Sequence, residues 1–206
     1  MARLYAIVDA EVLVARGLAL EDLARELRAA GVELVQYRNK KGTPQEVLRG
    51  AGILREVFAG SGCRLIMNDR ADLAVLAGFD GVHVGQGDLL PEDARRVVGP
   101  DRIVGVSTHT ESQVRVAQSS GADYVAIGPV FATDTKADAE QVVGLEGVRR
   151  ARALTTKPLV AIGGITRANA RSVIDAGADS VAVISALLAP GESVEQTARD
   201  FLELLR

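Results

Sequence analysis

The chain has 206 residues, and 48% of them are hydrophobic, which is enough for one substantial core. A net charge of −3 argues against a nucleic-acid-binding role, for which a basic surface is expected. No apolar segment approaches the ~20 residues of a membrane span, and the first apolar run is too short for a signal peptide. The single cysteine, Cys63, cannot form an intramolecular disulfide, which suits a reducing compartment. We therefore expect a soluble cytoplasmic protein with neither nucleic acid nor membrane as partner.

Short β-branched apolar segments alternate with longer amphipathic segments from end to end. The segments expected to form strands are 4–9, 32–38, 64–69, 81–86, 102–108, 124–130, 158–165 and 180–187. The segments expected to form helices are 20–27, 43–59, 71–77, 91–98, 111–119, 145–153, 167–176 and 194–205. Glycines such as Gly31, Gly121 and Gly177 precede strands, where a left-handed helix cap favours glycine. The pattern predicts eight strands, each followed by one helix.

Eight such units with nearly continuous apolar strands predict a parallel sheet covered by helices. At this length the economical closed form is a single (β/α)8 TIM barrel of the α/β class, spanning 1–206 as one catalytic domain. The alternative is an open doubly wound sheet, but no Gly-x-Gly-x-x-Gly motif follows the first strand. In a barrel the active site lies at the carboxyl ends of the strands, so the residues that end each strand become the candidates for function.

The second expected strand ends in three polar side chains, Gln36, Arg38 and Lys40. Because side chains alternate along a strand, all three lie on one face, where an amide, a guanidinium and an ammonium converge at the rim. The alternative is a set of exposed charges with no shared role. Their common face on an otherwise buried strand favours a functional cluster.

Two acids end the next two strands. Asp69 and Asp88 are expected to lie close enough to share a hard cation such as Mg²⁺, which uses one or two carboxylates together with phosphate oxygens and water. Asp69 could instead cap the following helix. His83 lies within the fourth strand and is interpreted as a hydrogen-bonded packing residue. Ser107 ends the fifth strand and could bond a heterocycle or cap a helix.

Two further stretches indicate a phosphorylated ligand. The stretch 124–136 runs from an apolar strand into a loop that carries Thr133, Thr135 and Lys136. A strand that leads into hydroxyls and a positive charge is typical of a phosphate pocket, although a polar surface loop is the plain alternative. The pair Gly163-Gly164 ends the seventh strand, next to the usual phosphate site of these barrels.

A series of motifs follows in a fixed order along the chain. The motifs are Gln36-x-Arg38-x-Lys40, Asn68-Asp69-Arg70, Gly81-Val82-His83-Val84-Gly85-Gln86-x-Asp88, Gly105-Val106-Ser107-Thr108-His109-Thr110, Gly128-Pro129-Val130-Phe131-x-Thr133-x-Thr135-Lys136, Ala161-Ile162-Gly163-Gly164-Ile165 and Val183-Ile184-Ser185-Ala186. Each motif alone is weak evidence, but the whole series is highly specific. With it, the sequence resembles the thiamine-phosphate synthase (thiamine-phosphate pyrophosphorylase) family over essentially its whole length.

The resemblance implies a Mg²⁺-dependent transferase of thiamine biosynthesis. Such enzymes join hydroxymethylpyrimidine diphosphate to a thiazole phosphate, often its carboxylated form, and release pyrophosphate. The implied ligands of the pyrimidine diphosphate are Gln36, Tyr37, Arg38, Asn39, Lys40, Asn68, Ser107 and Lys136. The implied ligands of the thiazole phosphate are Thr133, Asp134, Thr135, Gly164, Ile184 and Ser185. The implied catalytic residues are Arg38, Lys40, Ser107 and Lys136, and the implied Mg²⁺ ligands are Asp69 and Asp88.

Two residues depart from the usual pattern of the family: Ala132 stands in place of a proline, and Gly87 in place of a commoner acid. Three alternatives stay open, namely a thiazole tautomerase-type relative, a non-catalytic sensor of thiamine precursors and a phosphosugar isomerase or epimerase. A tautomerase tends to lack the cluster on the second strand, a sensor has no need of two Mg²⁺ ligands, and an isomerase requires an acid/base pair that we do not find. The sequence leaves open whether copies of the chain form a homo-oligomer.

Overall fold

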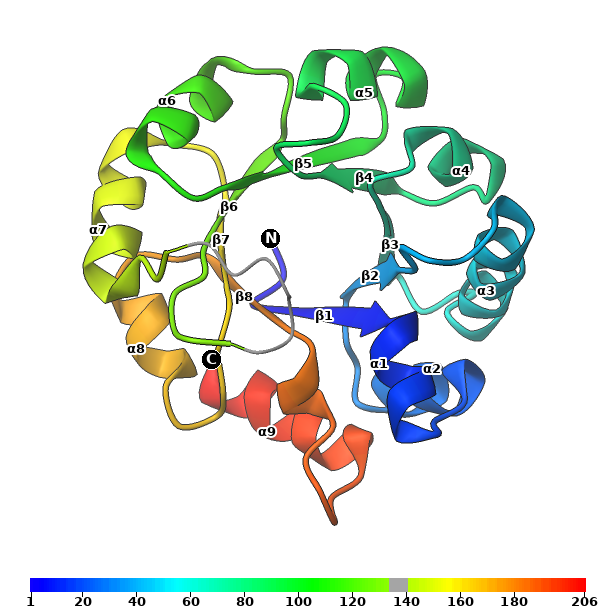
Figure 1. The fold of residues 1–206 in the computed structure, drawn as a ribbon. Helices are drawn as coiled ribbons and strands as arrows, with labels where there is room; N and C mark the ends of the chain where they lie inside the picture. The colour runs from blue at the N-terminus through cyan, green and yellow to red at the C-terminus, as the bar shows by residue number, and fades with distance from the viewer. Residues whose placement is uncertain (134–140) are drawn as a thin grey trace.

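The computed structural model describes residues 1–133 and 141–206. Eight parallel strands close into a barrel in which each strand pairs with the next and β8 pairs with β1 (Figure 1). The expected (β/α)8 barrel is therefore confirmed. The strands are β1 (Leu4–Asp9), β2 (Leu34–Arg38), β3 (Arg64–Asn68), β4 (Gly81–Val84), β5 (Ile103–Thr108), β6 (Tyr124–Ile127), β7 (Leu159–Ile162) and β8 (Ser180–Val183).

Helices surround the barrel as an outer ring (Figure 1). They are α1 (Ala10–Arg16), α2 (Leu20–Ala29), α3 (Pro44–Val57), α4 (Ala71–Leu76), α5 (Pro91–Val98), α6 (Glu111–Ser119), α7 (Gly144–Leu154), α8 (Ala170–Asp175) and α9 (Val194–Leu204), with a 3₁₀ turn η1 (Ser185–Leu187) after β8. Within the described part of the chain, no helix is long and apolar enough to cross a bilayer.

The expectation of one helix after each strand is wrong at β1, which is followed by both α1 and α2. Asp9 ends the strand and also caps α1, because its Oδ1 accepts hydrogen bonds from the N–H groups of Glu11 and Val12. Gly17 ends this short helix in the left-handed conformation at φ 63°. Because Asp9 is both the last residue of β1 and the N-cap of α1, the sequence pattern shows no loop between the strand and this helix.

Several strands also end earlier than expected. β4, β6 and β7 end at Val84, Ile127 and Ile162, rather than at 86, 130 and 165. Each of these ends is followed by glycine, which favours departure from the strand ladder. The residues that leave the ladder form the loops at the carboxyl ends of the strands, where the active site of a barrel is built.

The barrel interior carries its own small core, separate from the larger core between strands and helices. It is formed by Tyr5, Ile7, Leu34, Ile66, Tyr124, Ala126, Val160 and Ala182. Gln36 and His83 are also buried there, next to the two tyrosines. Polar groups in such a place require hydrogen-bond partners, and none of the buried side-chain nitrogen and oxygen atoms in the described residues lacks one.

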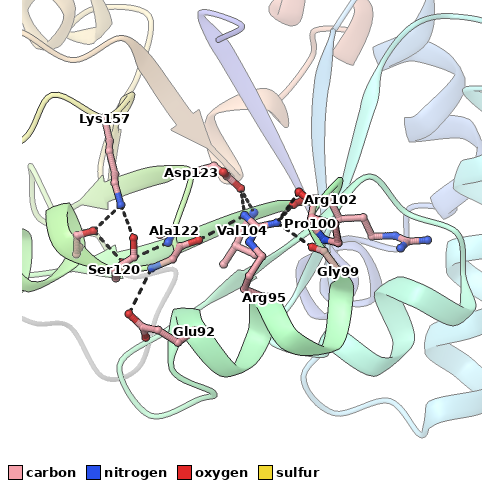
Figure 2. Close-up of polar contacts among 12 residues, drawn as sticks. Glu92, Arg95, Gly99, Pro100, Arg102, Val104, Ser120, Ala122, Asp123 and Lys157 are labelled. Atoms are coloured by element: carbon pink, nitrogen blue, oxygen red, sulfur yellow. Dashed lines mark hydrogen bonds and ion pairs between the residues drawn. The ribbon is translucent and has the colours of Figure 1, made fainter.

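At the opposite end of the barrel, a repeated pair of hydrogen bonds made by an aspartate, here called a clasp, joins neighbouring strands. An aspartate just before β6, Asp123, donates its N–H to the carbonyl of Val104 on β5 at 2.6 Å and accepts the N–H of Val104 at 2.7 Å (Figure 2). Asp80 clasps Leu65 in the same way, and Asp179 clasps Leu159. Each clasp completes hydrogen bonding at the amino end of a strand.

Candidate active site

Two cavities adjoin at the carboxyl ends of the strands. The larger, of about 400 Å³, lies over the ends of β5 to β8, and the smaller, of about 70 Å³, is lined mainly by residues of β1 to β5. The residues that line both are Ser107, Ala126, Ile162, Ala182 and Ile184. The site therefore has two compartments that meet over a mostly apolar floor, which suits the joining of two molecules.

The polar face expected on β2 is confirmed: Gln36, Arg38 and Lys40 all line the smaller cavity. Tyr37 and Asn39 belong to the opposite face and line neither cavity. Tyr37 is buried against helix α3, and its hydroxyl lies where a Cβ on Gly50 would be only 2.2 Å away. The Tyr37 and Asn39 side chains thus lie on the other face of β2 from the smaller cavity, because neighbouring residues of a strand point to opposite sides.

The two cations of this face are each held by a carboxylate. Arg38 donates through Nη1 to Oδ2 of Asp9, its register partner on β1. Lys40 Nζ lies 3.2 Å from Oδ2 of Asp69, and 49% of its side chain remains exposed. Asn68, at the end of β3, lines the same cavity. The compartment therefore offers a guanidinium, an ammonium and two amides to a bound anion.

Asp69 and Asp88 meet beside these cations, as expected. Asp69 has a left-handed backbone at φ 61°, which is uncommon outside glycine, and its side chain contacts Asp88. Burial, followed by the adjacent Asp88 carboxyl, raises the pKa of Asp69 above its ordinary value. The helix-capping alternative for Asp69 is wrong, because Arg70 is the N-cap of α4 and its side chain makes no capping bond.

This acidic pair fits Mg²⁺ in its donor chemistry. Two carboxylates that repel one another are stabilised by a cation between them, and Asp88 is held in place by the N–H of Gly85 at 2.8 Å. Among residues 1–133 and 141–206, no group of three or more His, Cys, Asp or Glu side chains could enclose a metal. A pair leaves coordination positions for phosphate oxygens and water, which is the way that Mg²⁺ is usually held.

Ser107 lies at the junction of the two cavities, and the structure ties it to His83. The Nε2 atom of His83 lies 2.8 Å from Ser107 Oγ, while Nδ1 lies 2.8 Å from the hydroxyl of Tyr124. The helix-capping alternative for Ser107 is wrong, because Thr110 caps α6 in a capping box with Gln113. The interpretation of His83 as hydrogen-bonded is confirmed.

The larger cavity is lined by the expected residues Thr133, Gly164, Ile184 and Ser185. Gly164 has φ 63°, and a Cβ there would lie 2.5 Å from the carbonyl oxygen of Ala132. The glycine is therefore needed for the close approach of the loop after β6. Asp134, Thr135 and Lys136 lie outside the described residues.

Sequence reasoning missed several residues of the site. Arg16 and Arg167 both line the larger cavity. Arg16 reaches from α1 to the carbonyl of Leu188, and Arg167 pairs with Glu192 at 2.7 Å. Asp9 was also missed, because its position opposite Arg38 follows from the register of β1 on β2, which no local pattern in the sequence reports.

Comparisons with known proteins agree with this geometry. The sequence profile described as thiamine monophosphate synthase matches residues 4–187. This chain belongs to the thiamine monophosphate synthase family. A thiamine-phosphate synthase of Koribacter versatilis is 55% identical over 98% of this chain and 95% of that protein. One from Methanoculleus marisnigri is 44% identical over 92% of this chain and 89% of that protein.

A solved structure supports the same assignment. Thiamine phosphate pyrophosphorylase from Pyrococcus furiosus superposes with a TM-score of 0.87 at 32% identity, covering 98% of this chain and 95% of that one. The family resemblance read from the sequence is therefore confirmed, across both the fold and nearly the full length.

Proposed function

We propose that this protein is a Mg²⁺-dependent thiamine-phosphate synthase, a transferase of thiamine biosynthesis. It transfers the 4-amino-2-methylpyrimidin-5-ylmethyl group from its diphosphate to a thiazole phosphate and releases pyrophosphate; with the carboxylated thiazole phosphate as acceptor, CO₂ is also lost. The observation that carries the proposal is the pair of adjoining cavities, one lined by Arg38, Lys40 and the acidic pair, the other by the glycine-rich loop after β7. Membership of the family supports it independently.

The smaller compartment suits the diphosphate. The bond from the methylene carbon to the diphosphate oxygen breaks, and both electrons leave with pyrophosphate. Arg38 and Lys40 supply positive charge where this negative charge develops, so they stabilise the transition state more than the ground state. Mg²⁺ held by Asp69 and Asp88 would neutralise further diphosphate charge.

The larger compartment suits the acceptor. Gly164, Ile184 and Ser185 surround a place where backbone N–H groups can approach a phosphate closely. A thiazole phosphate anchored there would direct its ring towards Ser107, which lines both compartments. Holding the two rings together lowers the entropic part of the barrier.

The proposed chemistry needs no strong general base. The cation left on the pyrimidinylmethyl carbon is delocalised by the ring amine, and the lone pair of the thiazole nitrogen forms the new C–N bond directly. The two histidines of the chain have other roles in the structure: His83 bonds Tyr124 and Ser107, and His109 Nδ1 lies 2.6 Å from the carbonyl of Gly128. These roles accord with a reaction driven by charge stabilisation and positioning.

The test is turnover of purified protein with Mg²⁺ and both substrates. We expect equal amounts of pyrophosphate and thiamine phosphate, and neither product when the pyrimidine diphosphate is left out. A parallel assay offers the carboxylated thiazole phosphate alone and follows its isomerisation. Tautomerase activity without pyrophosphate release would favour the tautomerase alternative, and precursor binding without either activity would favour a sensor.

A further inference from the structure

Five side chains from five strands form one continuous hydrogen-bond chain through the barrel interior. Gln36 Nε2 lies 2.8 Å from the Tyr5 hydroxyl, which lies 2.9 Å from that of Tyr124. Tyr124 bonds Nδ1 of His83, and Nε2 of His83 bonds Ser107, each at 2.8 Å. The hydrogen-bond chain ends at Ser107, at the junction of the two cavities, so it connects the buried interior of the barrel to the site.

The rings of this chain are fixed by packing. Tyr5 and Tyr124 meet edge to face with centroids 6.0 Å apart, and the His83 ring stacks on Tyr124 at 5.5 Å. Gly105 makes room for Tyr124, because a Cβ there would lie 2.0 Å from its ring. The bonded atoms therefore keep their partners, and the placement of the hydrogens is the remaining variable.

The donor at the Gln36 end sets the direction of every bond. Burial raises the pKa of both phenols above their ordinary value, so each keeps its one hydrogen. Tyr5 accepts from Gln36 and must give its own hydrogen to Tyr124, since a buried hydrogen without a partner is costly. Tyr124 in turn gives its hydrogen to Nδ1 of His83. A neutral imidazole that accepts at Nδ1 carries its hydrogen on Nε2, which faces Ser107.

We propose that this hydrogen-bond chain makes Ser107 a hydrogen-bond donor to the substrate, with Tyr5, Tyr124 and His83 as positioning residues. Ser107 Oγ accepts from His83 Nε2, which leaves its own hydrogen for the ligand. The inference rests on the proposed function for the identity of that ligand, a pyrimidine ring nitrogen with a lone pair. Ser107 lines both cavities together with Ala126, Ile162 and Ala182, an apolar surface that suits a flat ring better than a hydrated diphosphate.

The proposal makes Ser107 a determinant of specificity. In a 4-aminopyrimidine the ring nitrogens accept hydrogen bonds, whereas in the 4-oxo analogue one of them carries a hydrogen. A Ser107 hydroxyl that is fixed as a donor would point its hydrogen at the ring N–H of the 4-oxo analogue, and no hydrogen bond could form between them. Sites built around such a polar contact reject the mismatched ligand strongly, because buried groups lose their partners.

The first test is the ¹⁵N spectrum of ring-labelled histidine in the unliganded protein above neutral pH. The protein has two histidines, and His109 serves as the internal reference. Its Nδ1 faces the carbonyl oxygen of Gly128, which can only accept a hydrogen bond. We expect the hydrogen on Nε2 in His83 and on Nδ1 in His109. A hydrogen on Nδ1 of His83 would overturn the proposal.

Two variants test the direction of the chain. Gln36→Glu at pH 8 puts an accepting carboxylate at the start, so we expect the hydrogen of His83 to move to Nδ1. Tyr124→Phe breaks the chain and should leave His83 a mixture of both forms. Tyr37→Phe removes a phenol hydroxyl on the other face of β2 and should leave the His83 signals as they are. An unchanged His83 in both Gln36→Glu and Tyr124→Phe would refute the inference.

The second test compares turnover of the 4-amino and 4-oxo pyrimidine diphosphates. Wild-type protein should prefer the amino substrate, and Tyr124→Phe should reduce the ratio of the two kcat/KM values by about tenfold, as loss of one oriented hydrogen bond predicts. An unchanged ratio would remove Ser107 from recognition of the ring. Absence of turnover with either substrate in the wild type would count against the proposed function alone, because the ¹⁵N spectrum judges the hydrogen-bond chain without substrate.

Discussion

Arg38 donates a hydrogen bond to Asp9 where β1 and β2 end side by side, and Asp9 is only 3% exposed. The two oxygens of this carboxylate do different things. Oδ2 holds the guanidinium over the smaller cavity, while Oδ1 accepts from Glu11 and Val12 at the start of α1. The first helix of the fold and a proposed diphosphate ligand thus depend on one buried acid.

Asp9→Asn should separate these two roles. Asparagine caps helices as well as aspartate does, so α1 should remain. The guanidinium loses a charged partner, and loss of a charge-assisted bond costs roughly 1.5–3 kcal/mol, or about 10- to 100-fold in kcat/KM for the pyrimidine diphosphate. Steady-state kinetics on the folded variant measure the effect. Glu11→Gln is the matched control, because it breaks only the outer pair with Lys41 and should stay within a few-fold of wild type.

Asp88→Asn should raise the Mg²⁺ concentration needed for half-maximal activity by about tenfold or more, since even indirect partners of a metal commonly change affinity that much. The reason is the loss of one of two carboxylates from the acidic pair. A Mg²⁺ titration of the initial rate measures it. Asp72→Asn, which removes an acid paired with Arg70 on the nearby helix, should leave the titration unaltered. The same curve for wild type and Asp88→Asn would place the metal elsewhere.

Much of this site could be predicted from local patterns. Alternation along β2 places Gln36, Arg38 and Lys40 together, because a strand has a period of two whatever its surroundings. The same rule should have separated Tyr37 and Asn39 from them. The ligand set implied by the resemblance runs without a gap from Gln36 to Lys40, and so it includes side chains from both faces of the strand.

The rest depends on register, which no local pattern reports. Tyr5 and Tyr124 are 119 positions apart, and their bond follows from the closure of the barrel and the alignment of its strands. The double role of Asp9 likewise becomes visible only when β1 lies against β2. Polar residues on apolar strands were the available signal, because a buried polar group needs a partner.

Arg167→Gln should make the stability of the protein less sensitive to acid. Arg167 joins the loop after β7 to Glu192, which precedes α9, and to Asp200 within α9. The hydrogen bond from Arg167 holds the pKa of Glu192 below its ordinary value, and Gln196 followed by Arg167 does so for Asp200. An acid whose pKa is lowered in the folded protein contributes stability at pH values above its ordinary pKa. This contribution is lost as the pH falls through the lowered pKa.

The difference between wild type and Arg167→Gln should therefore be constant above about pH 5 and shrink towards zero as the pH falls below the ordinary acid range. Urea unfolding at a series of pH values measures it. Arg171→Gln is the matched control, because its partner Asp175 lies one turn away on the same exposed helix face. A difference that grows with acid would show that the Arg167 cluster does not stabilise the fold in this way.

Asp123→Ala should weaken the barrel without changing its chemistry. Asp123 accepts the N–H of Val104, a fully buried residue, and pairs with Arg95 at the end of the barrel away from the site (Figure 2). Removing the carboxylate leaves that N–H without its acceptor, which should lower the free energy of unfolding by roughly 1–2 kcal/mol. The kcat should stay within about twofold of wild type, because carboxyl ends of the strands carry function and the amino ends carry stability. Urea unfolding and turnover, measured beside the exposed-residue control Asp101→Ala, check both halves. A fall in kcat at full folding would mean that the two ends of the barrel are coupled.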